Sequence, residues 1–392
     1  MADLSVDFAG MHFPNPFMLA SAPPTRTAEM INRAFAAGWG GAVTKSIALD
    51  PAEDLQPRLQ ALRHSRRNIG MENVELSTQL TVEDWQREVA SVKAAYPDRP
   101  LWASIMDAPE EKNWQRLTEA LQEAGIDALE INVSCPHGMP SKGMGAFIGQ
   151  NAELTGEVVS WVKKVSTVPI VVKLTPNVTD ITFVARAAKE NGADALCTVN
   201  TVSGLIGVDL ETLTPLPSVG GVSTYGGYSG PGIKPIALRC VAQIAKATGL
   251  PVSGLGGLST WQDAVEFMAV GASTVQVCTA VMWSGYSVIE KLLAGVNNYL
   301  DGKGFANLEP VIGAALPKIV EFPEMPLTPR VRACVDDTCN GCLLCVTACD
   351  DGGFQAITGL KGEIVTIDRE NCDGCSLCVM VCPLDSITMM PR

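Results

Sequence analysis

Residues 339–349 read Cys-Asn-Gly-Cys-Leu-Leu-Cys-Val-Thr-Ala-Cys, and residues 372–383 read Cys-Asp-Gly-Cys-Ser-Leu-Cys-Val-Met-Val-Cys-Pro. Both runs follow the spacing C-x2-C-x2-C-x3-C of two-cluster ferredoxins, in which the fourth Cys of each run binds the other run's cluster. The first run ends in Cys349-Asp350 and lacks the usual Pro, which leaves the number of ligands unchanged. The spacing predicts a small α+β domain with two [4Fe–4S] clusters. The expected ligand sets are Cys339, Cys342, Cys345 and Cys382 for one cluster, and Cys372, Cys375, Cys378 and Cys349 for the other.

Structural zinc sites or disulfides are the alternative explanation of these cysteines. Zinc sites pair C-x2-C motifs across a longer loop and do not place three Cys in one turn. The chain has 13 Cys, and its N-terminus shows no basic segment followed by an apolar stretch, as a signal peptide would. Thiols used in this way indicate a reducing compartment. We therefore expect a cytoplasmic protein that transfers single electrons.

The bulk composition limits the remaining possibilities. At 392 residues with 47% hydrophobic residues, the chain is long enough for one large and one small domain. No apolar run approaches the roughly 18 residues that a membrane span needs. The net charge of −13 argues against binding to nucleic acid or to anionic membranes. We expect a large domain over 1–325, a Pro-rich linker near Phe322–Pro329 and the ferredoxin-type domain over 330–392.

Apolar, strand-like runs alternate with amphipathic helical stretches through the first three hundred residues. Eight such units in one domain predict an α/β fold of the TIM (β/α)8 barrel type. A doubly wound sheet would normally carry a Gly-rich turn after its first strand, where this chain has Ser21-Ala22-Pro23-Pro24. The expected strands are Pro16–Ala20, Ala42–Lys45, Leu101–Ile105, Ala128–Val133, Ile170–Leu174, Ala195–Val199, Val252–Gly254 and Thr274–Val277.

Two long connections interrupt this alternation. Ile47–Thr81 and Val202–Lys234 both leave the C-terminal face of the predicted barrel, where barrel enzymes build their active sites. An extra helix is expected over Phe305–Ile319. The other expected helices are Glu83–Tyr96, Glu111–Ala124, Glu153–Val165, Ile181–Asn191, Ile236–Thr248, Trp261–Ala269 and Ser287–Leu300.

Several expected strands end in polar residues, which a purely structural barrel would not need. Lys45 and Lys173 end the second and fifth strands. A buried ammonium without a partner is costly, so we expect an anionic or electron-rich ligand at Lys173. Gly256-Gly257 precedes a helix expected over Ser259–Ala269, and a helix N-terminus after small residues suits a phosphate. Because clusters supply one electron and organic substrates usually accept two, a flavin is the expected intermediary. FMN, which carries a single phosphate, fits best.

Cys135 is the most informative single side chain of the predicted barrel. A Cys usually occurs as a small buried apolar residue, and that reading suits Cys197 in a strand and Cys240 on a helix. Cys135 instead begins a loop of small residues after the fourth strand, where a thiol over a flavin would act as an acid. His137, two residues later, either tunes this thiol, contacts the substrate or faces water.

Five segments together resemble the dihydropyrimidine dehydrogenases, in their FMN barrel and in the two-cluster module that follows it. The resemblance covers essentially the whole chain and implies the pyrimidine-reducing subunit of the bacterial, NAD-dependent, two-subunit kind. The segments are Leu19-Ala-Ser-Ala-Pro-Pro-Thr25, Asn132-Val-Ser-Cys-Pro-His-Gly-Met139, Lys173-Leu-Thr-Pro-Asn-Val-Thr-Asp180, Asn200-Thr-Val-Ser-Gly204 and Tyr225-Gly-Gly-Tyr-Ser-Gly230.

The resemblance implies roles for matching residues in the reversible reduction of uracil or thymine to 5,6-dihydropyrimidines. Cys135 would be the general acid/base that protonates carbon 5, while hydride goes from the flavin to carbon 6. Lys45 and Lys173 would stabilise negative charge on the flavin. The substrate would be bound by Asn73, Asn132, Ser134, Asn200 and Thr201. The FMN site would be completed by Ser21, Ser46, Gly230, Leu255, Gly256, Gly257, Cys278 and Thr279, the last five around the phosphate.

The sequence leaves two other functions open. Dihydroorotate dehydrogenases share the barrel, FMN and a Ser-Cys-Pro loop, but the Cys-type members usually continue with Asn, where this chain has His137. The chain could also be chiefly an electron-transfer protein.

No G-x-G-x-x-G turn is present for a dinucleotide, so we expect FAD and NAD on a partner flavoprotein subunit. The resemblance implies a homodimer of this chain within a heterotetramer.

Overall fold

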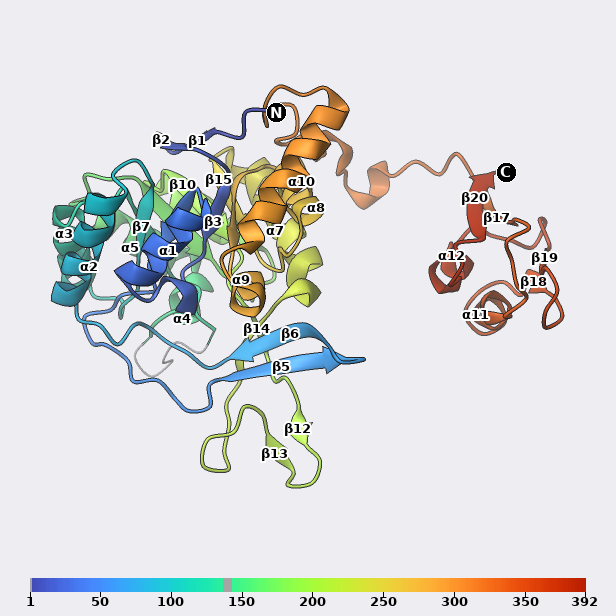
Figure 1. Cartoon of the computed structure of the whole chain (residues 1–392), viewed down its shortest axis with the longest axis horizontal. Coiled ribbons are helices and arrows are strands. Elements are labelled where there is room, and N and C mark those ends of the chain that lie inside the picture. The colour runs from blue at the N-terminus through green and yellow to red at the C-terminus, as the bar shows by residue number, and fades with distance from the viewer. Residues whose placement is uncertain (1, 137–142) are drawn as a thin grey trace. The chain divides into compact units, whose positions relative to one another are not determined.

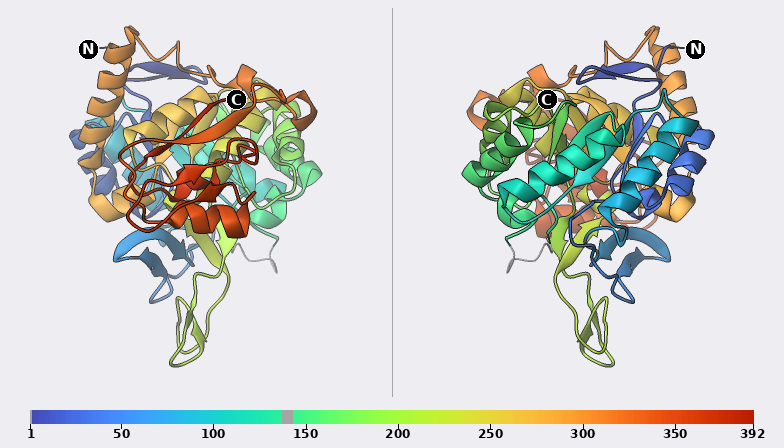
Figure 2. Two further views of the ribbon diagram at one scale, coloured as in Figure 1. Left: turned by 90° about the vertical axis from the view of Figure 1, so that its right-hand side faces the viewer. Right: turned by 90° about the vertical axis from the view of Figure 1, so that its left-hand side faces the viewer.

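The computed structural model describes residues 2–136 and 143–392, so the expected site residue His137 lies outside the described residues. The chain forms two compact units, Met1–Lys318 and Ile319–Arg392. In the first unit eight strands close into a parallel barrel ringed by helices (Figures 1 and 2). The predicted TIM barrel is confirmed. Around the barrel the strands are β3 (Phe17–Leu19), β4 (Gly41–Val43), β7 (Leu101–Ile105), β8 (Ala128–Asn132), β9 (Ile170–Leu174), β10 (Ala195–Thr198), β15 (Val252–Leu255) and β16 (Ala272–Val277).

The helices pack against the outside of the barrel through the apolar residues that face away from its axis. On β9, Ile170, Val172 and Leu174 join the core shared with the helices, whereas Val171 lies in the separate core inside the barrel. This alternation is the two-residue period of a strand. The barrel unit's helices are α1 (Ala28–Ala37), α2 (Val82–Ala95), α3 (Glu111–Glu123), α4 (Ala146–Gly149), α5 (Ala152–Lys163), α6 (Ile181–Glu190), α7 (Lys234–Thr248), α8 (Trp261–Ala269), α9 (Thr279–Ser284) and α10 (Val288–Lys303).

The two ends of the barrel interior differ in chemistry. The N-terminal end is apolar and is covered by the hairpin of β1 (Val6–Phe8) and β2 (Met11–Phe13), with Phe8 stacked on Trp102 at 5.4 Å between ring centroids. The C-terminal end carries the polar strand ends, and in β8 and β9 the register sets Asn132 beside Lys173. Because one end is filled with aromatic side chains, a ligand can enter only from the other.

The two long connections form a second sheet, which the sequence did not predict. Strands β5 (Leu59–His64), β6 (Arg67–Asn73), β14 (Gly226–Ser229) and β11 (Val202–Gly204) pair antiparallel beside the C-terminal end of the barrel. Glycine permits this packing, because a Cβ on Gly70 would meet the Tyr228 hydroxyl at 2.1 Å. A hairpin of β12 (Val208–Asp209) and β13 (Thr214–Pro215) extends beyond this sheet (Figure 2).

The prediction of an extra helix over Phe305–Ile319 is wrong. This segment forms turns and ends in a short 3₁₀ helix, η4 (Leu316–Lys318). Pro310 and Pro317 each lack a backbone N–H, and Gly313 has a φ of +74°. The backbone N–H groups of Gly313 and Ala315 do not form helical hydrogen bonds. They donate to the carbonyl oxygens of Met268 and Ala269, at the end of α8, at 2.8 and 2.9 Å.

The second unit is a small α+β domain with an internal duplication. It contains β17 (Val331–Val335), α11 (Leu344–Gly352), β18 (Ile357–Thr358), β19 (Thr366–Ile367), α12 (Leu377–Val381) and β20 (Ile387–Pro391). Leu343 and Ser376, at equivalent positions before the two helices, both adopt a left-handed backbone with φ of 65° and 68°.

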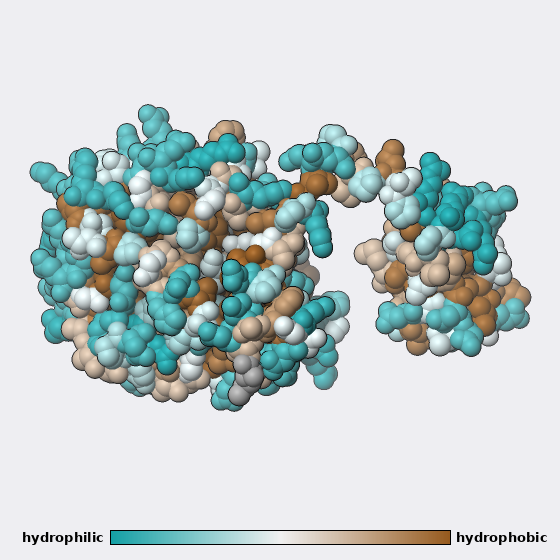
Figure 3. Space-filling view, turned by 90° about the horizontal axis from the view of Figure 1, so that it is seen from above, coloured by the Kyte–Doolittle hydropathy of each residue, from teal (hydrophilic) through white to brown (hydrophobic). Residues whose placement is uncertain are grey.

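Hydrophilic residues cover most of the barrel unit's face in Figure 3, with apolar residues scattered among them. A search of the helices in the described residues found none with the length and apolar character that crossing a membrane requires.

Candidate functional site

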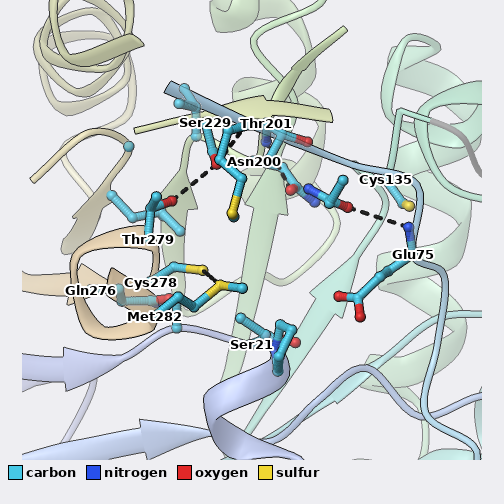
Figure 4. A pocket seen from close by; sticks show the side chains of 18 of the residues that line it. Ser21, Glu75, Cys135, Asn200, Thr201, Ser229, Gln276, Cys278, Thr279 and Met282 are labelled. Carbon is cyan, nitrogen blue, oxygen red and sulfur yellow. Dashed lines mark hydrogen bonds between the residues drawn. The ribbon is translucent and has the colours of Figure 1, made fainter. Parts of the chain in front are cut away.

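A cavity opens at the C-terminal end of the barrel, where barrel enzymes bind their ligands. The barrel strand ends supply one wall and the second sheet supplies another (Figure 4). Fourteen of the sixteen expected barrel-site residues line it, all except Ser134 and Gly230. They are Ser21, Lys45, Ser46, Asn73, Asn132, Cys135, Lys173, Asn200, Thr201, Leu255, Gly256, Gly257, Cys278 and Thr279.

A hydrogen-bonded amide cluster forms the substrate side of the cavity. Asn132 Nδ2 donates to Ser46 Oγ at 2.8 Å, and Asn132 Oδ1 accepts from Ser134 Oγ at 2.9 Å. Asn200 Nδ2 donates to Ser134 Oγ at 2.9 Å, so Ser134 holds both amides without lining the cavity itself. Side chains fixed in this way present donors and acceptors in set directions, which suits a ring with C=O and N–H groups.

Asn73 reaches the same cavity from the second sheet. It is the last residue of β6, and its Nδ2 donates to the Gly227 carbonyl at 3.1 Å. Gly227 lies on β14 against Thr201, where a Cβ would meet Thr201 Oγ1 at 2.2 Å. The second sheet therefore joins residues far apart in sequence around one opening.

Cys135 is buried in the cavity wall, with 7% of its surface exposed, and packs against Ala48 and Met106. The Ala146 N–H donates to the Cys135 carbonyl at 2.9 Å, which ties the far end of the intervening loop back to its start. Figure 4 shows the Cys135 thiol on the same side of the cavity as Glu75. Asn132 and Asn200 line the same cavity, so a ring held by these amides would share it with the thiol.

Both lysines of the cavity already have a carboxylate partner within the protein. Lys45 Nζ lies 3.2 Å from Glu75 Oε2, and Lys173 Nζ lies 3.3 Å from Glu130 Oε1. Burial, the largest single influence, lowers the pKa of Lys173, but the charge and hydrogen bond of Glu130 together with the nearby thiols of Cys197 and Cys278 raise it, so the net shift is upward and Lys173 stays charged. The lysines therefore do not need a ligand to neutralise them, contrary to the prediction, because buried Glu residues balance their charge.

The glycine-rich end of the cavity differs from the expectation that a helix N-terminus binds a phosphate there. The helix begins at Trp261, and the N–H groups of Ser259 and Thr260 donate to Asp263 Oδ2 at 2.9 and 2.8 Å. The helix N-terminus is thus occupied by its own acidic cap. Gly256 and Gly257 have φ of +121° and +81°, which bare their backbone toward the cavity.

Gly230 and Thr279 complete this end. Gly230 does not line the cavity, but its carbonyl oxygen would lie 2.9 Å from a Cβ on Gly257. Position 257 therefore needs glycine for the two backbone segments to pack this closely. Thr279 Oγ1 donates to Ser229 Oγ at 3.0 Å (Figure 4). Burial raises the pKa of Cys278 to about 11, so this thiol is neutral at physiological pH and adds no negative charge.

The cavity contains groups that fit a flavin mononucleotide. Gln276 is 1% exposed and lines the cavity, and its Oε1 atom is buried with no hydrogen-bond partner among the described residues. An unpaired buried acceptor is costly unless a ligand donates to it. Together with the Gly256-Gly257 backbone, it offers partners for a polar ring edge and a phosphate.

The small domain brings its eight motif cysteines into two sets. One cavity of about 340 Å³ is lined by Cys349 together with Cys372, Cys375 and Cys378. A second, of about 290 Å³, is lined by Cys382 together with Cys339, Cys342 and Cys345. In the described residues no three His, Cys, Asp or Glu gather closely enough for a single metal ion. None of the 13 cysteines, all of which lie in the described part of the chain, forms a disulfide.

Backbone N–H groups point at the sulfur atoms of one set. Ala333 donates to Cys372 Sγ at 3.4 Å and Ala356 to Cys349 Sγ at 3.3 Å. Donors aimed at thiolate sulfur are a recognised influence on cluster potential. Gly341 and Gly374, inside the two Cys-x-x-Cys turns, cannot carry a side chain, because a Cβ would lie 2.4 Å from Glu363 N and 2.5 Å from the Val331 carbonyl.

Sequence reasoning missed four polar residues of the barrel site: Glu75, Glu130, Ser229 and Gln276. Glu75, Ser229 and Gln276 line the cavity, and Glu130 lies beneath it as the partner of Lys173. A two-residue period was the available signal, since Glu75 follows Asn73, and Glu130 precedes Asn132, on the same face of an extended chain.

Comparison with known proteins places the chain in a family. Residues 3–300 match the model of the dihydroorotate dehydrogenases, and residues 333–389 match the 4Fe-4S dicluster domain. The chain belongs to the dihydroorotate dehydrogenase family. Within this family, it is 40% identical over 363 residues to the NAD-dependent dihydropyrimidine dehydrogenase subunit PreA of Escherichia coli K12, covering 91% of this chain and 87% of the other.

Two further relatives are named for two different activities. The chloroplastic dihydropyrimidine dehydrogenase (NADP(+)) of Arabidopsis thaliana is 40% identical over 328 residues, which is 80% of this chain and 77% of the plant protein. The catalytic subunit of dihydroorotate dehydrogenase B (NAD(+)) of Pyrococcus abyssi is also 40% identical, over 315 residues, which is 80% of this chain and 99% of the other. Identity alone therefore does not separate the two activities.

Proposed function

We propose that the chain reduces uracil or thymine to the 5,6-dihydropyrimidine, reversibly, at FMN bound in the barrel cavity. Electrons would reach the flavin from two [4Fe–4S] clusters in the small domain. The observation that carries this proposal is the placement of Cys135 beside the Asn132–Ser134–Asn200 cluster, on a chain that also matches a dicluster domain. The functional division proposed is 1–325 for the flavin domain and 330–392 for the cluster domain.

In this proposal the residues of the chain bind the ring and move one proton. Asn73, Asn132, Asn200 and Thr201 hold the imide edge, and Ser134 orients two of these amides. FMN, when bound, supplies a hydride to carbon 6 of the pyrimidine. The Cys135 thiol gives its proton to carbon 5, and the thiolate that remains is reprotonated from water before the next cycle. Lys45 and Lys173 stabilise negative charge at the flavin.

The cofactor site uses the remaining lining residues. Lys45, Lys173, Ser21 and Ser46 would lie along the flavin ring. The phosphate would be held by Leu255, Gly256, Gly257, Cys278 and Thr279, with Gly230 supporting the Gly257 backbone. For the clusters we propose the exchanged ligand sets, in which Cys349 and Cys382 each complete the set of the other run; the two cysteine-lined cavities support this.

The test is a half-reaction of the purified, FMN-loaded chain. Dihydrouracil, added without oxygen, should bleach the oxidised flavin, and dihydroorotate should bleach it far more slowly. Faster bleaching by dihydroorotate would make the chain a dihydroorotate dehydrogenase, a possibility that the equal identity to the Pyrococcus abyssi protein keeps open. No bleaching by either compound would favour a protein that chiefly transfers electrons.

We further propose a partner flavoprotein that carries FAD and binds NAD. The relative from Escherichia coli is named as a subunit. NADH delivers a hydride, whereas clusters accept single electrons, so a second flavin must connect them. The assembly proposed is a heterotetramer built on a homodimer of this chain. Its thirteen described cysteines form no disulfide, which suits a reducing compartment, and we take this compartment to be the cytoplasm.

A mixture of this chain with NADH and uracil should therefore show no sustained NADH oxidation in the absence of oxygen. Adding the partner flavoprotein should start turnover. The matched control is the same chain with dithionite in place of NADH, which should produce dihydrouracil and thus prove that the preparation is active. Sustained NADH oxidation by the chain alone would contradict the need for a partner.

A further inference from the structure

The cavity contains cations, but each one is matched by a carboxylate. Among the described residues that line the cavity, Lys45 and Lys173 are the only Lys or Arg. Lys173 is paired with Glu130 at 3.3 Å in the barrel interior, and Lys45 with Glu75 at 3.2 Å in the cavity wall. Of these two carboxylates, only Glu75 lines the cavity.

Glu75 also holds a second cation outside the cavity lining. Its Oε1 accepts from Arg58 Nε at 2.5 Å, while its own side chain is 3% exposed. Arg58 lies 3.7 Å from Asp54, which in turn pairs with Arg26. The Glu75 interaction raises the pKa of Arg58, mainly through this hydrogen bond. Arg58 is thus held by Glu75 and Asp54, and it does not line the cavity.

This arrangement has opposite consequences for two kinds of pyrimidine. An uncharged ring needs only the hydrogen bonds of the amide cluster. A ring that carries a carboxylate would bring a negative charge into a buried site whose lining lysines are already paired and whose wall holds Glu75. Burying a charge without a partner is strongly unfavourable, and a fixed like charge is a common way to reject a competitor.

We propose that Glu75 is the residue that selects uncharged pyrimidines over pyrimidine 6-carboxylates such as orotate. The inference rests on the proposed function and deepens it, since the relatives named for the two activities share the same 40% identity with this chain. Selection then depends on one local charge in the cavity wall.

A first test uses the unmodified chain and needs no variant. Uracil, orotate and the carboxamide of orotate are titrated against the oxidised, FMN-loaded chain, and dissociation constants are taken from the change in the flavin spectrum. The carboxamide has nearly the shape of orotate but lacks its charge. It should therefore bind more tightly than orotate, by about tenfold or more. Equal rejection of both compounds would mean exclusion by shape and would overturn the proposal, as would tighter binding of orotate.

A second test compares Glu75→Gln with Glu75→Asp. Removing the carboxylate frees Lys45 and Arg58, so in Glu75→Gln the ratio of kcat/KM for orotate to that for uracil should rise about tenfold or more. Glu75→Asp keeps the charge and should keep the ratio of the unmodified chain. The flavin content of each variant shows whether it still binds FMN. If a variant has lost FMN, the spectral titration of the unmodified chain decides whether charge excludes orotate.

Different results would contradict the proposed function and the proposed role of Glu75. If the unmodified chain is not oxidised or reduced by uracil or dihydrouracil, the proposed function is wrong. If it turns over uracil but Glu75→Gln leaves the orotate-to-uracil ratio unchanged, only the role of Glu75 is wrong.

Discussion

Replacement of Cys135 by Ala should lower the rate of uracil reduction about 10²–10⁴-fold, the usual contribution of general acid catalysis. The thiol lines the cavity together with Asn132 and Asn200, and the carboxylate on the same side, Glu75, is engaged by Lys45 and Arg58. Cys135→Ser should also lose much of the rate, because a hydroxyl is a far weaker acid than a thiol. The measurement is single-turnover oxidation of the reduced flavin by uracil.

FMN content should be unchanged in both variants, since the proposed flavin contacts lie elsewhere. Cys240→Ala is the matched control: this thiol is also buried, but on α7 and outside the cavity lining. It should keep the rate of the unmodified chain. A Cys135→Ala protein that retains half of its turnover would remove Cys135 from the mechanism.

Replacement of Cys349 by Ala should damage the cluster held by Cys372, Cys375 and Cys378, although Cys349 belongs to the other run in sequence. The structure places these four sulfur-bearing residues around one cavity. The cluster also joins the two halves of the domain, so its loss should loosen the whole domain. Iron content and the electron paramagnetic resonance spectrum of the reduced chain report which cluster remains.

Cys334→Ala serves as the control for this experiment. Cys334 lies on β17 in the same domain and lines neither cysteine cavity, so both clusters should survive its loss. Loss of the cluster at Cys339, Cys342 and Cys345 in Cys349→Ala, with the other intact, would contradict the exchanged sets.

The barrel was predictable because its signals are local. Each strand is a short apolar run such as Ile170–Leu174, and each following helix has its own period and terminating residue. The second sheet was not, because β6 and β14 pair across more than 150 residues of chain, as Asn73 with Gly227. Its strands are rich in glycine for close packing, which removes the alternation that identifies a strand.

The site residues divide in the same way. Lys45, Lys173 and Cys135 were recognisable as polar residues at strand ends. Their partners were not, because Glu75 lies in a long connection and Glu130 is an acidic residue within a buried strand. Only the three-dimensional pairing shows that the lysines are neutralised by the protein, and this pairing changes which ligands the cavity can accept.

The central claim is that electrons stored in the small domain reduce a pyrimidine in the barrel. The most direct measurement follows the electron paramagnetic resonance signal of the reduced clusters after uracil is added to the anaerobically reduced chain. The account predicts that the cluster signal disappears as dihydrouracil forms, with two electrons withdrawn for each product molecule. A cluster signal that persists while no dihydrouracil appears, in a chain with full FMN and iron content, would contradict it.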